Sequence, residues 1–169
     1  MGESKQLKHY FDKDLAVMLA DKICPVYSGF KKQAFVKEVV LAVQELELKQ
    51  RVATIADALF QELPSDYTKT LNIFAEILGP ENRKETGMFT EGYWLMPVAY
   101  YVEKYGIEHF TESVRFIEEL TKRHTGEYAI RPFLVTYPLK TLKVMSRWSK
   151  SNNTHVRRLA SEGLRPRLP

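Results

Sequence analysis

The spacing of apolar residues constrains this chain most, because it repeats with the period of an α-helix along nearly the whole length. Near the N-terminus, for example, Leu15, Leu19 and Ile23 fall four residues apart and share one helical face. No stretch alternates polar and apolar residues for long enough to predict a β-strand. The sequence therefore predicts an all-α protein without a sheet.

Glycine, proline and polar residues divide the periodic segments into successive helices. We expect helices near residues 15–23, 30–46, 49–62, 64–78, 91–105, 110–123, 128–137, 138–149 and 153–163. Pro64 is expected in the first turn of its helix, and Thr90 is expected to cap the helix that follows it. Pairs of helices recur at roughly 35–45 residues, a spacing that fits HEAT or armadillo units. Without a clear internal sequence repeat, periodicity alone supports only an all-α bundle.

Charge is distributed unevenly along the chain. The net charge is +4. Residues 140–169 hold eight Lys and Arg residues against Glu162 alone, a net charge of +7, whereas the first 139 residues hold 17 basic and 20 acidic residues, a net charge of −3. A neutral-to-acidic body with one basic end is typical of a protein that binds a polyanion. The alternative is a polar end of a repeat array that binds no ligand.

Several classes of protein and site are disfavoured by composition. A single cysteine, Cys24, excludes an internal disulfide and fits a reducing compartment. No apolar run approaches the roughly 20 residues of a membrane span, and the N-terminus lacks an apolar signal core. The four histidines are scattered, so we expect no metal site, and no nucleotide-binding fingerprint points to a cofactor. We expect a cytoplasmic monomer that does not bind membranes.

The segment 152–169, NNTHVRRLASEGLRPRLP, combines a short helix with a stiff loop. Asn152, Asn153 or Thr154 can cap the helix, and Gly163 ends it. The prolines that follow keep the RPRLP loop out of a helix. The arginines of this segment are suited to bind phosphate groups: Arg157, Arg158, Arg165 and Arg167. The alternative is a solvated basic helix end.

Aromatic side chains near charged residues offer a second group of candidates. We expect Glu91, Tyr93 and Trp94 in the first turn of a helix. There, Glu91 can simply stabilise the helix dipole. Tyr93 and Trp94 either pack in the core or stack on a cationic base. Trp148 lies between Arg147 and Lys150 in the sequence, and we favour a core position for its indole over a contact with DNA.

Glu127 has two interpretations. It follows Thr125-Gly126 at the expected start of a helix, with Arg131 four residues later. On this spacing alone, an exposed Glu–Arg pair on one helix face is the simpler explanation.

Three segments resemble one known family in the same order. HVRRLASEGLRPRLP closely resembles a stretch of the AlkC branch of the AlkC/AlkD-type DNA alkylation repair glycosylases, as do TEGYWLMPVAYYVEKYG and TGEYAIRPF. The resemblance extends from about Phe11 onward and is strongest after residue 87. Because these proteins are built from HEAT-like repeats, it implies an α-solenoid of HEAT-like helical repeats, here as a single domain over residues 1–169.

The resemblance also implies a function and a site. In AlkC-like proteins the glutamates of the GEY and ASEG segments line the cleft for the alkylated base, and these match Glu127 and Glu162. The expected activity is hydrolysis of the N-glycosidic bond of cationic bases, of the 3-methyladenine or 3-methylcytosine type, in double-stranded DNA. We expect Arg157, Arg158, Arg165, Arg167, Arg147 and Lys150 to bind DNA, and Tyr93 and Trp94 to contact the base. The alternative is a non-catalytic HEAT-like binding module, either a protein scaffold or a DNA-binding relic.

One departure from the family pattern bears on activity. In the family, the RPRLP segment runs on into a tryptophan and further helical repeats that carry an active-site aspartate, whereas this sequence stops at Pro169. We therefore expect the chain to be the N-terminal part of a longer solenoid, with little or no base excision on its own.

Overall fold

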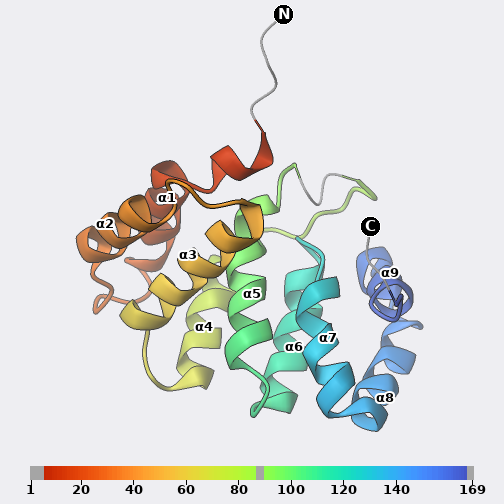
Figure 1. Ribbon diagram of the computed structural model, residues 1–169. Helices are drawn as coiled ribbons and strands as arrows, with labels where there is room; N and C mark the ends of the chain where they lie inside the picture. The colour runs from red at the N-terminus through yellow and green to blue at the C-terminus, as the bar shows by residue number, and fades with distance from the viewer. Residues whose placement is uncertain (1–5, 87–89, 167–169) are drawn as a thin grey trace, which may run out of the picture. The chain divides into compact units, whose positions relative to one another are not determined.

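The computed structural model describes residues 6–86 and 90–166, and every regular element in these ranges is helical (Figure 1). The all-α prediction is therefore confirmed for the described part of the chain. None of the described helices is both long enough and apolar enough to cross a membrane. The chain divides into two compact units, Met1–Ile77 and Leu78–Pro169, and the expectation of one domain over 1–169 stays a prediction.

The first unit is a small helical bundle. Its elements are η1 (Leu7–Tyr10), α1 (Lys13–Ile23), α2 (Lys32–Ala42), α3 (Leu48–Glu62) and α4 (Tyr67–Ile77). Helix α1 packs against α2 and α4, and α2 packs against α3. The core consists of aromatic and aliphatic side chains at helical spacing, among them Phe11, Leu15, Leu19, Phe35, Ile55, Leu59 and Phe74.

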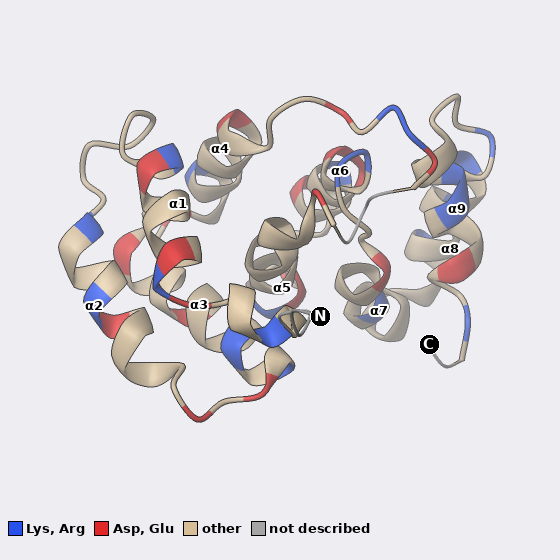
Figure 2. Ribbon diagram, turned by 90° about the horizontal axis from the view of Figure 1, so that it is seen from above, with Lys and Arg blue, Asp and Glu red and all other residues tan. Residues whose placement is uncertain are grey.

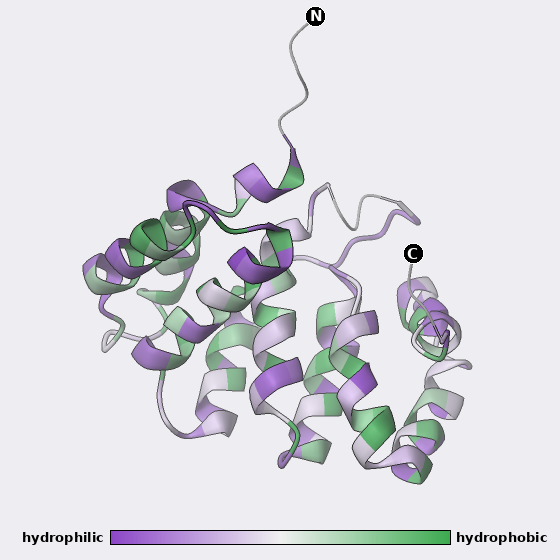
Figure 3. Cartoon of the chain, viewed as in Figure 1, coloured by the Kyte–Doolittle hydropathy of each residue, from purple (hydrophilic) through white to green (hydrophobic). Residues whose placement is uncertain are grey.

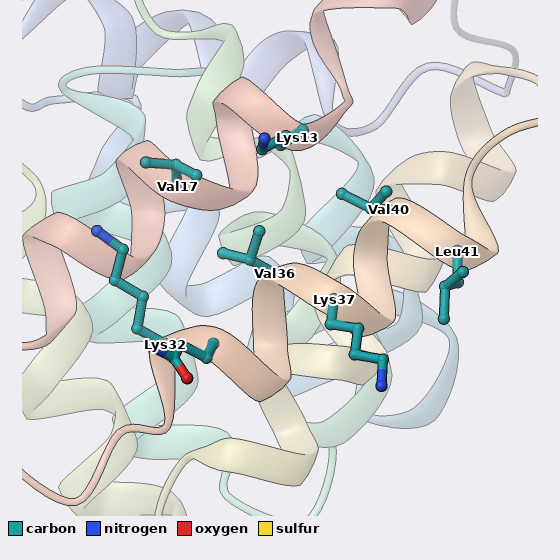
Figure 4. A pocket seen from close by; sticks show the side chains of 8 residues that line it. Lys13, Val17, Lys32, Val36, Lys37, Val40 and Leu41 are labelled. Atoms are coloured by element: carbon teal, nitrogen blue, oxygen red, sulfur yellow. The ribbon is translucent and has the colours of Figure 1, made fainter.

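A groove lies between α1 and α2 in this unit. Figure 4 shows Val17 of α1 and Val36 and Val40 of α2 facing the space between the helices. Helix α2 buries only Phe35 and Val39. The pair of helices therefore leaves a strip of aliphatic side chains within reach of solvent.

The second unit carries the candidate site residues. Its elements are η2 (Tyr93–Leu95), α5 (Met96–Tyr105), α6 (Phe110–Thr121), α7 (Glu127–Thr136), α8 (Pro138–Trp148) and α9 (Thr154–Glu162). Helix α7 packs against α5, α6 and α8, while α9 packs against α6 and α8. The helices are apolar on one side and polar on the other (Figure 3), so their apolar sides form the core. The largest fully buried side chains of this core are Leu95, Tyr101, Ile117, Phe133 and Trp148.

The predicted start of α4 is wrong. The helix begins at Tyr67, not in the turn after Pro64. The Asp66 side chain accepts a hydrogen bond from the backbone N–H of Lys69 at 3.0 Å, and the Pro64 carbonyl accepts one from the Thr70 hydroxyl at 3.0 Å. Asp66 therefore caps the helix, because its side chain satisfies an N–H group that the first turn leaves open.

The predicted start near residue 91 is also wrong. A 3-10 turn, Tyr93–Leu95, comes first, and α5 begins at Met96 with Pro97 in its first turn. Proline is suited to this position because its fixed φ matches the helix and its missing N–H is not needed there. Glu91 therefore lies outside the helix, where its carboxylate forms an exposed ion pair with Lys84 at 3.2 Å.

Candidate active site

Glu127 and Glu162 come together from two helix ends. Glu127 is the first residue of α7, and Glu162 is the last residue of α9. Their carboxyl groups lie close enough for each to shift the pKa of the other. The structure thus pairs the two glutamates that the family resemblance singled out, and we call them the carboxyl pair.

Two glycines allow the close approach around this pair. Gly126 comes directly before α7, and a Cβ atom there would lie 2.8 Å from side-chain atoms of both Ile117 and Thr121. Gly163 comes directly after α9, and a Cβ atom there would lie 3.0 Å from the side chains of Ile130 on α7 and Met145 on α8. Larger residues would force the helices apart, since a packed core yields little space. The glycines of the GEY and SEG segments therefore help to bring the two carboxyl groups together.

Arginines flank the Glu162 side of the pair. The Arg158 Nε atom lies 2.8 Å from Glu162 Oε1, and an Arg165 terminal nitrogen lies 3.7 Å from the same oxygen. The Glu162 side chain is only 13% exposed, whereas both arginine side chains are more than half exposed. The hydrogen bond with Glu127, followed by that with Arg158, lowers the pKa of Glu162 against the opposing effect of burial.

The environment of Glu127 has the opposite effect. Burial, and then the hydrogen bond with Glu162, raise the pKa of Glu127, although the Thr125 hydroxyl and the charge of Arg158 act against this. The environments of the two carboxyl groups therefore push their pKa values apart, with that of Glu127 raised and that of Glu162 lowered. Such a separation is typical of carboxyl pairs that divide acid and base roles.

Arg131 does not form the ion pair with Glu127 that helical spacing alone suggested. One of its terminal nitrogens instead donates to the backbone carbonyls of Arg165, at 2.9 Å, and Pro166, at 3.1 Å. The interpretation of Glu127 as half of an exposed i,i+4 pair is therefore wrong.

The other predicted DNA-binding residues lie along α8, α9 and their connection, where Lys and Arg are coloured blue in Figure 2. Arg157 donates to the Ser151 carbonyl at 2.7 Å, and this holds its side chain at the start of α9. Arg147 and Lys150 line a hollow together with Lys143, a further basic residue of α8. Arg167 lies outside the described residues.

Trp148 is a core residue, so its predicted core position is confirmed. Its side chain is 1% exposed, and its indole N–H donates to the Glu118 carboxylate at 2.8 Å. The same carboxylate oxygen lies 3.2 Å from a terminal nitrogen of Arg147. Glu118 therefore links a core residue to a predicted DNA-binding residue, and no local sequence pattern signals this role.

Tyr93 and Trp94 are half-buried on η2, just before α5. Their predicted contact with the base stays a prediction.

Among the described residues, no group of three His, Cys, Asp or Glu side chains is arranged to hold a metal ion. His124 and His155 are buried, at 3% and 5% exposure.

The two glutamates are expected to affect stability with opposite signs. At pH 8, Glu127→Gln should leave the thermal midpoint of unfolding unchanged or raise it. The substitution removes a half-buried carboxyl group whose pKa is raised in the folded state, so its charged form is disfavoured there. The stabilising contribution of Glu127 is complete below its unfolded pKa and is lost as pH rises through its folded pKa. Glu162→Gln should lower the midpoint, because it removes the partner of Arg158 and Arg165.

The stabilising contribution of Glu162 to the folded state is present above the pKa that its carboxyl group has in the unfolded chain. This contribution is lost as pH falls through the lowered pKa of the folded state. Thermal melts at pH 5 and pH 8 would measure both effects. Glu91→Gln is a matched control, since it removes the same charge from an exposed ion pair with Lys84. Equal destabilisation by Glu127→Gln and Glu162→Gln at pH 8 would contradict the asymmetry.

The chain is similar to two longer proteins. It is 36% identical over 164 residues to a Bacillus subtilis (strain 168) protein named "Uncharacterized protein YhaZ", and this match covers 96% of the chain and 43% of that protein. It is also similar to the Pseudomonas fluorescens alkylpurine DNA glycosylase AlkC, solved bound to DNA containing an abasic site analog. This structural match has a TM-score of 0.86 and 33% identity, and it covers 98% of this chain and 44% of that one. No family model matches the chain.

The chain thus spans less than half the length of either relative. The matches confirm both the resemblance carried by the three sequence segments and the helical-repeat fold that it implied. Over almost its whole length, the chain is therefore similar to AlkC in both sequence and helical-repeat fold.

Proposed function

We propose that this protein acts in the repair of alkylated DNA, as a glycosylase or the site-bearing part of one. Its substrates are cationic bases of the 3-methyladenine or 3-methylcytosine type in double-stranded DNA. The observation that carries this proposal is the carboxyl pair, which joins the start of α7 to the end of α9 and has Arg158 and Arg165 beside Glu162. The similarity to a protein named as an alkylpurine DNA glycosylase supports it.

The chemistry of such a substrate suits a carboxyl pair. A base alkylated at N3 carries a positive charge, which makes it a good leaving group, so the N-glycosidic bond breaks with cationic character on the sugar. A nearby negative charge stabilises that cation, and a positioned water completes the hydrolysis. No attack on the intact base is required.

The environments of the two glutamates fit different roles in this reaction. Glu162, whose pKa is lowered, stays ionised and supplies negative charge beside the developing cation. Glu127, whose pKa is raised, is the stronger base of the two when it is ionised, and this suits it to accept a proton from the attacking water. A neutral base gains less from this negative charge than a cationic one, so the pair also selects the damaged base.

The arginines around the pair suit the DNA backbone. Arg158 and Arg165 contact Glu162, yet their side chains remain 53% and 54% exposed. They are therefore able to reach phosphate oxygens while they border the carboxyl pair. Together with Arg157 and the basic residues of α8, they supply a phosphate-binding surface around an acidic centre.

Release of alkylated bases tests the proposed activity directly. Duplex DNA treated with a methylating agent would be incubated with this chain and with a longer form that carries the family's tryptophan and aspartate, and free bases would be separated by chromatography. Release by the longer form supports the glycosylase. Binding of the duplex without any release by either form would favour the non-catalytic binding module.

DNA binding should depend strongly on salt. About four phosphate contacts give a slope near −3.6 when the logarithm of the binding constant is plotted against that of the salt concentration. Arg157→Ala combined with Arg165→Ala should make the slope shallower by about 1.8. Fluorescence anisotropy with a labelled duplex would measure this, with Arg115→Ala on the exposed face of α6 as a control for loss of charge. A binding constant that does not change with salt would refute the interface.

A further inference from the structure

We propose that Arg131 is a positioning residue that fixes the backbone of residues 165 and 166 and so holds the Arg165 guanidinium beside Glu162. This inference rests on the proposed function only in that the segment it positions is the one proposed to contact DNA. Its structural part is testable without any DNA.

The contacts of Arg131 are directed at this segment. It lies on α7, one turn after Glu127, and one terminal nitrogen donates to the carbonyls of both Arg165 and Pro166, at 2.9 and 3.1 Å. Its other terminal nitrogen is buried and finds no acceptor among the described residues. All described hydrogen bonds of the guanidinium therefore go to the backbone after α9.

The segment has little else to fix it. Helix α9 ends at Glu162, so residues 164–166 make no helical hydrogen bonds of their own. The Arg165 N–H donates to the Glu162 carbonyl at 3.1 Å, while Pro166 has no N–H to donate. The Leu164 side chain is 48% exposed and adds limited burial. A cationic donor that reaches two successive carbonyls is a strong restraint for such a loop.

When the backbone at residue 165 is fixed, the position and direction of the Cα–Cβ bond of Arg165 are fixed as well. The Arg165 guanidinium lies 3.7 Å from the Glu162 carboxylate, close enough for its charge to act on the pair. Helix α7 therefore contributes twice to the site. It carries Glu127 itself, and through Arg131 it positions a cation beside Glu162.

The first test uses the protein alone. Arg131→Gln should speed amide hydrogen exchange at Arg165 by more than tenfold while α7, α8 and α9 keep their protection. Arg131→Lys retains a cationic donor and should restore part of the protection. Arg115→Gln removes the same charge from an exposed site on α6 and should change nothing. Unchanged exchange at Arg165 in Arg131→Gln would overturn the proposal.

The second test asks whether Arg131 acts on DNA through Arg165. The salt slope for binding a duplex with an abasic-site analogue would be measured for Arg131→Gln, Arg165→Gln and the double variant. Each single change should make the slope shallower by about 0.9, the equivalent of one phosphate contact, and the double variant should show no further change. Additive losses would mean that Arg131 contacts phosphate itself, and would overturn the positioning role.

The two tests also separate this inference from the proposed function. If the protein binds no DNA, the proposed function fails, yet hydrogen exchange at Arg165 still decides whether Arg131 positions the segment. If DNA binding is normal and Arg131→Gln affects neither measurement, the positioning role fails while the proposed function stands.

Discussion

Replacing either member of the carboxyl pair with glutamine should slow base release by about a hundred- to a thousandfold in a longer form of the protein that is active. This corresponds to about 2.7–4 kcal/mol of barrier, the typical cost of losing one preorganised group at the reacting centre. Glutamine keeps the size and most hydrogen bonds of glutamate but removes its charge. Folding and DNA binding should therefore be retained in Glu127→Gln and Glu162→Gln.

Single-turnover release of methylated bases would measure the effect, with circular dichroism to check folding and anisotropy to check binding. Glu91→Gln serves as a control, because Glu91 forms an exposed ion pair with Lys84 outside the carboxyl pair. A glutamate on an exposed helix face would cost at most a few tenths of a kcal/mol of stability and nothing in rate. Full excision by both glutamine variants would refute the site and favour the binding module.

Trp148→Ala should lower the free energy of unfolding by about 3–5 kcal/mol, the usual cost of deleting a large aromatic side chain from a core. This is a large part of the roughly 5–15 kcal/mol that stabilises a typical domain. The indole is 1% exposed and donates to Glu118 at 2.8 Å, so its removal leaves a cavity and an unpaired acceptor. Urea denaturation at a fixed pH would measure the loss.

Trp148→Phe and Glu118→Gln separate the two parts of this effect. The phenylalanine variant keeps most of the packing but loses the hydrogen bond, so it should cost less than the alanine variant. The glutamine variant keeps an acceptor for the indole and loses the ion pair with Arg147. If Trp148 instead contacted DNA, Trp148→Ala would weaken binding and leave the unfolding transition in place.

The helical content was predictable from the sequence because it depends on local spacing. The apolar period located every long helix, and Gly163 and Asn153 mark the ends of α9 as expected. The two wrong helix starts have local causes that compete with periodicity. Asp66 caps α4 beyond Pro64, and Pro97 delays α5 until after a 3-10 turn.

The site was only partly predictable, because its contacts join residues far apart in the chain. Spacing alone favoured an exposed pair of Glu127 with Arg131, and only the resemblance to a known family selected Glu127 and Glu162 together. The bond from Arg131 to Arg165 spans 34 residues, and that from Trp148 to Glu118 spans 30. Such partners depend on how the helices pack, and neither periodicity nor a local motif encodes that.

The carboxyl pair depends on a short helix, and this has a consequence for its behaviour on warming. Helix α9 has only nine residues, and Glu162 is the last of them. An opening of α9 separates the two carboxyl groups even while α5 to α8 remain folded, and such local openings require less free energy than global unfolding. We therefore expect the pair to come apart on warming before the helical signal of the unit is lost.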